Sequence, residues 1–169
     1  GILFPLEGIV NGHHRRDEKG KMKIINQLKV GVPLIVREES LTPNPNKDYS
    51  VGDLITGYGV SETIIHYYNI YGGEVKGKRV IIQGWGNVAG AAAYYLAQAG
   101  AIIVGIIDKA GGIVKSEGYS FKEIQSFLAN RSSNFLETED MLSFEQANEK
   151  IWNVGAEIFV PAAASRLLT

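Results

Sequence analysis

The sequence contains no cysteine among its 169 residues, which excludes a disulfide framework, a thiolate metal site and a thiol nucleophile. It also lacks an excess of one charge, because 17 lysine and arginine residues stand against 18 aspartate and glutamate residues. We therefore expect neither a nucleic-acid-binding surface nor a surface for anionic membranes. The absence of cysteine fits a cytoplasmic location.

No hydrophobic run is long enough to cross a bilayer. Residues 1–10 are apolar, but Pro5 and Glu7 interrupt them and no basic leader precedes them, so we expect neither a membrane span nor a signal peptide. Repeats and low-complexity tracts are absent as well. With 45% hydrophobic residues, the chain can form one domain with a proper core but not two large ones. Its first residue is glycine, which suggests an excised piece or a processed start.

What the chain does contain is a strand, a helix and a second strand in succession. Residues 79–83 are a β-branched run typical of a buried strand. Apolar residues then recur at helical spacing over residues 88–99, and Gly100 ends the helix. A second apolar run, residues 101–107, ends on Asp108. This pattern predicts a βαβ unit of an α/β fold, a Rossmann-type doubly wound parallel sheet.

The turn between the first strand and the helix has the G-x-G-x-x-A pattern of dinucleotide-binding proteins. Gly84 permits the tight turn, Gly86 lets the backbone approach a pyrophosphate, and small Ala89 lets the helix pack on the strand. The helix N-terminus offers free N–H groups to the phosphates. A simple tight turn is the alternative, but strand, turn, helix, strand and acid in register favour dinucleotide binding.

Asp108 lies about twenty residues after the turn, where a carboxylate accepts hydrogen bonds from both hydroxyls of an adenosine ribose. A carboxylate there also repels a 2′-phosphate, so the sequence favours NAD over NADP. Lys109 argues the other way, because its ammonium could neutralise that phosphate and make NADP possible. Two glycines follow shortly after, so Asp108 could instead be a simple turn residue.

Further elements are expected on both sides of this unit. Thr56 would open a helix, either as its N-cap or with its hydroxyl facing a ligand. Ser120 would cap a helix over residues 120–130, and another short helix would cover residues 143–150. Residues 156–160 predict a buried strand that delivers small residues at its carboxyl end, where a flat ring can approach the backbone.

The first fifty residues are less informative. Residues 28–36 contain a proline and predict an extended segment or an edge strand. Residues 13–16, two histidines and two arginines, favour a solvated loop or helix end over a metal or phosphate site, because no further ligand spacing supports one.

Four blocks resemble, in order and spacing, the family of amino-acid dehydrogenases that act on glutamate, leucine, phenylalanine or valine. They are TGYGV at 56–60, QGWGNV at 83–88, DKAGGI at 108–113 and PAA at 161–163. The likeness covers about residues 52–169, and the third block is most like the glutamate branch. The resemblance implies oxidative deamination of L-glutamate to 2-oxoglutarate and ammonia with NAD or NADP, in a homo-oligomer.

The resemblance also implies roles for single residues. Thr56 would lie near the nicotinamide end, Asn87 and Val88 would contact the cofactor, and Ala162 and Ala163 would line the nicotinamide side. With the turn and the acid, the predicted cofactor-binding set is Thr56, Gly84, Trp85, Gly86, Asn87, Val88, Asp108, Lys109, Ala162 and Ala163. The chain departs from the family in Tyr58 and Gly52, where arginines are usual, and in Ala89, which replaces the third glycine.

Members of this family carry catalytic lysines and an aspartate on a separate N-terminal domain, and nothing here matches them. We therefore predict no catalytic residue and no metal ligand. Residues 1–50 would be a segment of uncertain structure, and residues 51–169 a Rossmann domain truncated at its C-terminal end, because such a fold has about six strands. The chain alone would be inactive. A leucine, phenylalanine or valine type of dehydrogenase, or a non-catalytic nucleotide-binding module, stays open.

Overall fold

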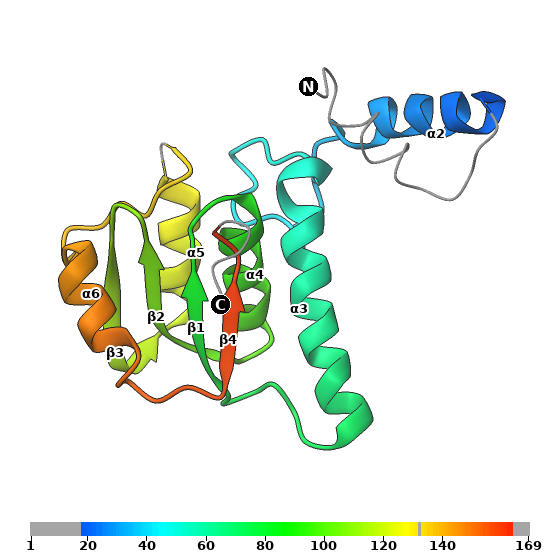
Figure 1. Ribbon diagram of the computed structural model, residues 1–169. Coiled ribbons are helices and arrows are strands. Elements are labelled where there is room, and N and C mark those ends of the chain that lie inside the picture. The colour runs from blue at the N-terminus through cyan, green and yellow to red at the C-terminus, as the bar shows by residue number, and fades with distance from the viewer. Residues whose placement is uncertain (1–17, 132, 164–169) are drawn as a thin grey trace.

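A four-stranded sheet lies at the centre of the computed structural model, which describes residues 18–131 and 133–163 (Figure 1). The strands follow the order β3-β2-β1-β4 across the sheet. Their bounds are Arg79–Gln83 for β1, Ile102–Asp108 for β2, Gly111–Tyr119 for β3 and Ile158–Pro161 for β4. The structure confirms the predicted strand, helix and strand around the glycine turn.

Three of these strands are parallel, and one is not. Strand β1 pairs in parallel with β2 on one side and with β4 on the other. Strand β3 is antiparallel to β2, because only Lys109 and Ala110 connect them and a parallel connection needs a dozen or more residues. The sheet therefore differs from a wholly parallel one in its β3 edge strand.

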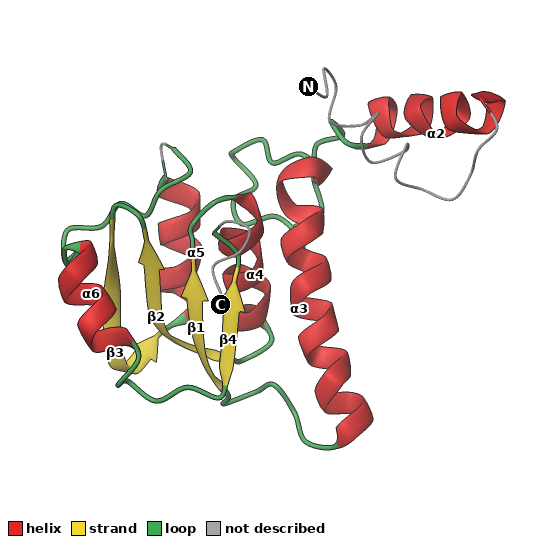
Figure 2. Cartoon of the chain, viewed as in Figure 1, coloured by secondary structure: helices red, strands yellow, loops and turns green. Residues whose placement is uncertain are grey.

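Helices cover both faces of the sheet, as a doubly wound fold requires (Figure 2). Alternate residues of β1 point to opposite faces: Val80 and Ile82 join the core beneath α4 and α5, whereas Ile81 joins a smaller core beneath α6. The helices are α2 at Glu18–Gly31, α3 at Val51–Tyr71, α4 at Asn87–Gln98, α5 at Phe121–Asn130 and α6 at Phe144–Ile151.

Three helices begin with a capping box, in which the N-cap serine and the residue three positions later bond to each other's backbone N–H. The pairs are Ser50 with Asp53, Ser120 with Glu123 and Ser143 with Gln146. The predicted helices after Ser120 and Ser143 are thereby confirmed. The prediction that Thr56 opens a helix is wrong, because Ser50 caps α3 earlier and Thr56 lies in its second turn.

The segment before α3 differs from the extended one predicted for residues 28–36. Residues 28–31 form the last turn of α2, and only Ile35 makes an isolated bridge, to Ser50. Figure 1 shows α2 extending away from the sheet. The paired histidines and arginines at residues 13–16 lie outside the described residues. None of the described helices has the length and hydropathy needed to cross a membrane.

Helix α3 packs against α4 at very short range. A Cβ atom on Gly57 would lie 2.5 Å from the Val88 carbonyl oxygen and 2.5 Å from the Ala91 Cβ. Such distances are too short for non-bonded atoms, so only glycine allows this approach. The contact brings the first half of α3 beside the first turns of α4, which follow the glycine turn in the chain.

We predict that Gly57→Ala lowers the free energy of unfolding by about 1–3 kcal/mol, because the added methyl forces α3 and α4 apart. Gly59→Ala is the matched control on the same helix, since a Cβ there meets no atom within 4 Å. We expect this control to raise stability by about 0.5–1 kcal/mol, the ordinary gain of alanine over glycine in a helix. Urea denaturation measures both, and equal effects of the two substitutions would contradict the α3–α4 packing.

Candidate functional site

The glycine turn lies where β1, β2 and β4 end. The Gly84 N–H donates a hydrogen bond to the Ile107 carbonyl at the end of β2, with N and O 2.7 Å apart. On the other side, the Ala162 N–H donates to the Gln83 carbonyl over 2.9 Å. The structure therefore brings the turn, the end of β2 at Asp108 and the small residues after β4 to one edge of the sheet.

Gly84 is required at this position by its backbone and by its neighbours. Its φ angle is +101°, a conformation that side chains rarely adopt. A Cβ atom there would also lie 2.9 Å from both the Ala162 carbonyl oxygen and the Ala163 Cα. The segment after β4 thus packs directly on the turn, which accounts for small residues at both places.

Neither the backbone conformation nor a close neighbour within the described part of the chain requires glycine at position 86. Gly86 is the N-cap of α4 with an ordinary φ of −70°, and a Cβ added to it meets no atom within 4 Å. Helix α4 also has no side-chain cap at this end. The first N–H groups of a helix lack partners inside the helix, so those of α4 are free to bind an anion at the open space beside Gly86.

Trp85 and Ala89 support this turn from inside the protein. Both are 0% exposed and belong to the main core. The indole Nε1 of Trp85 is buried without a hydrogen-bond partner among the described residues. Trp85 can therefore offer a ligand only its backbone, whereas Val88, on the first turn of α4, is partly exposed.

The Asn87 side chain is held by two charged residues that sequence reasoning missed. Its Nδ2 donates to Asp53 Oδ1 over 2.9 Å, and its Oδ1 accepts a hydrogen bond from Arg131 Nη2. Partial burial favours a higher pKa for Asp53, but hydrogen bonds from Ser50 and Asn87 outweigh it and lower that pKa. The Asn87 amide is thus occupied on both sides, which leaves its backbone N–H for a ligand.

Asp108 is 8% exposed, and both of its oxygens accept backbone hydrogen bonds. Oδ1 accepts from the Lys109 N–H over 2.6 Å, and Oδ2 accepts from the Leu136 N–H over 3.2 Å. These bonds hold Asp108, the last residue of β2, against the turn that follows it and against the loop at Leu136. Each carboxylate oxygen has two lone pairs, so one further hydrogen bond per oxygen is available. The predicted ribose contact would use these and stays a prediction.

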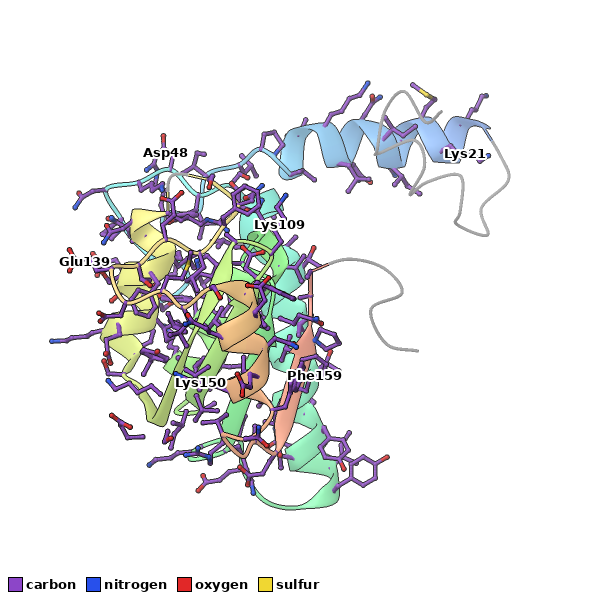
Figure 3. All side chains as sticks on the ribbon, turned by 60° about the vertical axis from the view of Figure 1, so that its left-hand side comes forward. Lys21, Asp48, Lys109, Glu139, Lys150 and Phe159 are labelled. Atoms are coloured by element: carbon purple, nitrogen blue, oxygen red, sulfur yellow. The ribbon has the colours of Figure 1, made fainter. Side chains whose placement is uncertain are left out.

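Lys109 projects from the same end of the sheet (Figure 3). Its Nζ lies 4.3 Å from the centre of the Phe135 ring, in a cation–π contact. The ammonium is therefore drawn towards Phe135, in the loop that also bonds to Asp108.

The nicotinamide-side candidates lie on two elements. Ala162 is half-buried and Ala163 is exposed directly after β4, against Gly84. Thr56 is exposed on α3, one residue from Gly57 and its contact with Val88. Tyr58, at a position where arginine is usual in the family that the motifs resemble, packs edge-on against Tyr95 with ring centres 5.1 Å apart.

A large groove of the described structure lies elsewhere. An open groove of about 1140 Å³ runs along β3 between α5 and α6, and none of the predicted site residues lines it. We place the candidate site at the glycine turn instead, because backbone N–H groups bind phosphates at a strand edge without a deep cavity. Among the described residues, no three histidine, aspartate or glutamate side chains are grouped so as to hold a metal ion.

Comparison with known proteins agrees with the four sequence blocks. The model of the glutamate/leucine/phenylalanine/valine dehydrogenase family matches residues 51–169. The chain belongs to this family. That assignment confirms the family suggested by the sequence motifs.

Several relatives within this family are glutamate dehydrogenases. An NADP-specific glutamate dehydrogenase of Saccharolobus shibatae is 30% identical over 67% of this chain and 26% of its own length. A cryptic catabolic NAD-specific glutamate dehydrogenase of Bacillus subtilis is 31% identical over 68% of this chain and 26% of its own length. The chain thus spans about a quarter of the length of these relatives.

A solved structure supports the fold. The hetero-hexameric glutamate dehydrogenase of Thermus thermophilus, in its leucine-bound form, superposes with a TM-score of 0.55 and 26% identity. The match covers 69% of this chain and 26% of that one. It confirms a partial Rossmann-type domain.

We predict that Gly84→Ala destabilises the protein by roughly 2–4 kcal/mol, since it adds backbone strain to a clash with Ala162 and Ala163. Gly86→Ala is the control two residues away, and we expect it to change stability by less than about 0.5 kcal/mol because its Cβ enters open space. Thermal melts of both variants measure the difference. Equal stabilities would contradict the packing of the β4 end on the turn.

Proposed function

We propose that this chain is the cofactor-binding part of a glutamate dehydrogenase, which oxidatively deaminates L-glutamate to 2-oxoglutarate and ammonia with NAD. One observation supports this proposal most. Helix α4 begins directly after Gly86 without a side-chain cap, at the sheet edge where three parallel strands end. The chain that carries this arrangement belongs to the dehydrogenase family. A nicotinamide cofactor is common to the relatives, whose names specify NAD in one case and NADP in another.

Each candidate residue has a part in this proposal. The backbone N–H groups of Gly86, Asn87 and Val88 bind the pyrophosphate, and the open space beside Gly86 admits it. Gly84 and Trp85 maintain the turn. Asp108 accepts hydrogen bonds from the adenosine ribose, while Lys109 lies beside it.

The nicotinamide ring would approach the opposite end of the site. Ala162 and Ala163 offer it a flat, small-residue surface, and Thr56 offers a hydroxyl. When bound, the nicotinamide would supply a hydride acceptor for oxidation at the amino-acid Cα, and Ala162, Ala163 and Thr56 would hold its ring. The lysines and aspartate that the family uses on the substrate have no match in this sequence, so this chain alone is expected to bind the cofactor without oxidising glutamate.

The proposal extends to the whole protein. The dinucleotide-binding domain begins near residue 51, and residues 1–50 precede it as an N-terminal segment. The protein acts as a homo-oligomer on a small amino acid in the cytoplasm. A substrate profile of the full-length protein distinguishes glutamate from leucine, phenylalanine or valine, and dinucleotide binding without turnover of any of them would indicate a non-catalytic module.

We predict that Gly86→Val abolishes dinucleotide binding, because its branched side chain fills the space that the pyrophosphate needs. The fold should be affected far less, since a Cβ atom added at this position meets no atom within 4 Å. Titration calorimetry with NAD, beside a thermal melt, measures both effects. A folded Gly86→Val variant with unchanged affinity would show that the phosphates bind elsewhere, and a wild-type protein that binds neither NAD nor NADP would overturn the proposed function.

We predict that the wild type binds NAD roughly tenfold more tightly than NADP, which corresponds to about 1.4 kcal/mol. The reason is that the Asp108 carboxylate accepts hydrogen bonds from ribose hydroxyls and repels a 2′-phosphate. Asp108→Ser should remove most of the preference. Asp108→Asn is the closer control, because it keeps an oxygen for the Lys109 or Leu136 N–H while losing the charge. A wild type that prefers NADP, or a ratio unchanged in both variants, would restrict Asp108 to its role in the turn.

A further inference from the structure

Arg131 is a cation that the sequence did not point to and that the fold places against the glycine turn. It follows α5 as its C-cap residue. Its Nη1 donates to the Trp85 carbonyl over 3.0 Å, and its Nη2 donates to Asn87 Oδ1. The same Nη1 lies 3.4 Å from the place a Cβ on Gly90 would occupy, so the guanidinium also lies against the first turn of α4.

This guanidinium is half-buried, and no carboxylate among the described residues is bound to it directly. None of the ion pairs found within the described ranges includes Arg131. Burial lowers its pKa, although the charges of Tyr49 and Asp53 act in the opposite direction. Because the pKa of an arginine lies far above neutral pH, the guanidinium stays protonated. The Asp53 carboxylate acts on this charge only through the intervening Asn87 amide, so an anionic ligand that binds nearby offsets more of the cost of partial desolvation.

Asp53 reaches Arg131 only through the Asn87 amide. The Asp53 carboxylate can only accept hydrogen bonds and the guanidinium can only donate them, so the amide must direct Nδ2 to Asp53 and Oδ1 to Arg131. Ser50 in turn holds Asp53 through its backbone N–H and its hydroxyl, at 2.9 Å and 2.7 Å from Asp53 Oδ2. The amino ends of α3 and α4 and the carboxyl end of α5 are thus joined at residue 87.

We propose that Arg131 is a positioning residue of the phosphate site, which rests on the proposed function above. It fixes the turn through the Trp85 carbonyl and the Asn87 amide. Its charge adds to the partial positive charge of the α4 N-terminus, so that the site selects a ligand with a pyrophosphate over an uncharged nucleoside. Arginine suits this position better than lysine, because its planar fork reaches two acceptors at once.

The test compares Arg131→Gln and Arg131→Lys with the wild type in the purified protein. Titration calorimetry with NAD at low and at physiological ionic strength gives the affinity and its salt dependence. We expect Arg131→Gln to weaken NAD binding about tenfold at low salt and to reduce the loss of affinity that salt causes. Arg131→Lys should keep the salt dependence of the wild type while losing part of the affinity, because it keeps the charge without the fork.

Lys47→Gln is the matched control. The Lys47 ammonium lies at the same end of α5, where it donates to the Ala129 and Arg131 carbonyls over 3.2 Å each, but it does not contact the turn. We expect NAD affinity to change less than twofold in this variant.

The outcomes separate this proposal from the function on which it rests. If the wild type binds neither NAD nor NADP, the proposed function fails. If the wild type binds NAD and Arg131→Gln binds it equally well, the role of Arg131 is overturned. An affinity loss with the salt dependence of the wild type, or an equal loss in Lys47→Gln, would also overturn it, because a purely structural or long-range effect predicts those results.

Discussion

The packing of two backbone segments at Gly84 is the constraint on which the rest of this structure depends. One hydrogen bond from its N–H reaches the end of β2, and the segment after β4 lies where a side chain would otherwise be. The carboxyl ends of three parallel strands therefore meet at one place. Because Gly84 leads into α4 within three residues, the same constraint determines where the helix N-terminus points.

A second close approach, between α3 and α4 at Gly57, adds side chains to this backbone framework. It brings the capped start of α3 beside the start of α4, and the Asp53 carboxylate then reaches Asn87. Arg131 completes the group from the end of α5. The candidate site thus consists of free backbone N–H groups at its centre, while side chains from three helices hold those groups in place.

The separate roles of backbone N–H groups and side chains allow the same domain to occur in enzymes that use different dinucleotides. Backbone N–H groups bind the phosphates that all dinucleotides share, so they do not distinguish one cofactor from another. In the proposed site the distinction would lie with side chains at the end of β2, where Asp108 is bonded within its own hairpin and to Leu136, and Lys109 lies against Phe135. Relatives specific for NAD and for NADP both occur in this family.

The sequence by itself determined the local elements, because their signals are short-range. The β-branched run of β1, the helical spacing of α4 and the serines before α5 and α6 specify strands, helices and caps within a few residues. The start of α3 was predicted six residues late, as the difference between Thr56 and Ser50, although the Ser50–Asp53 box was readable. Only the tertiary structure decided that Gly57 lies against α4 and that Arg131 reaches Asn87 across a separation of 44 residues. Such contacts depend on how whole elements pack, and no local pattern records which residue at the end of one helix meets the start of another.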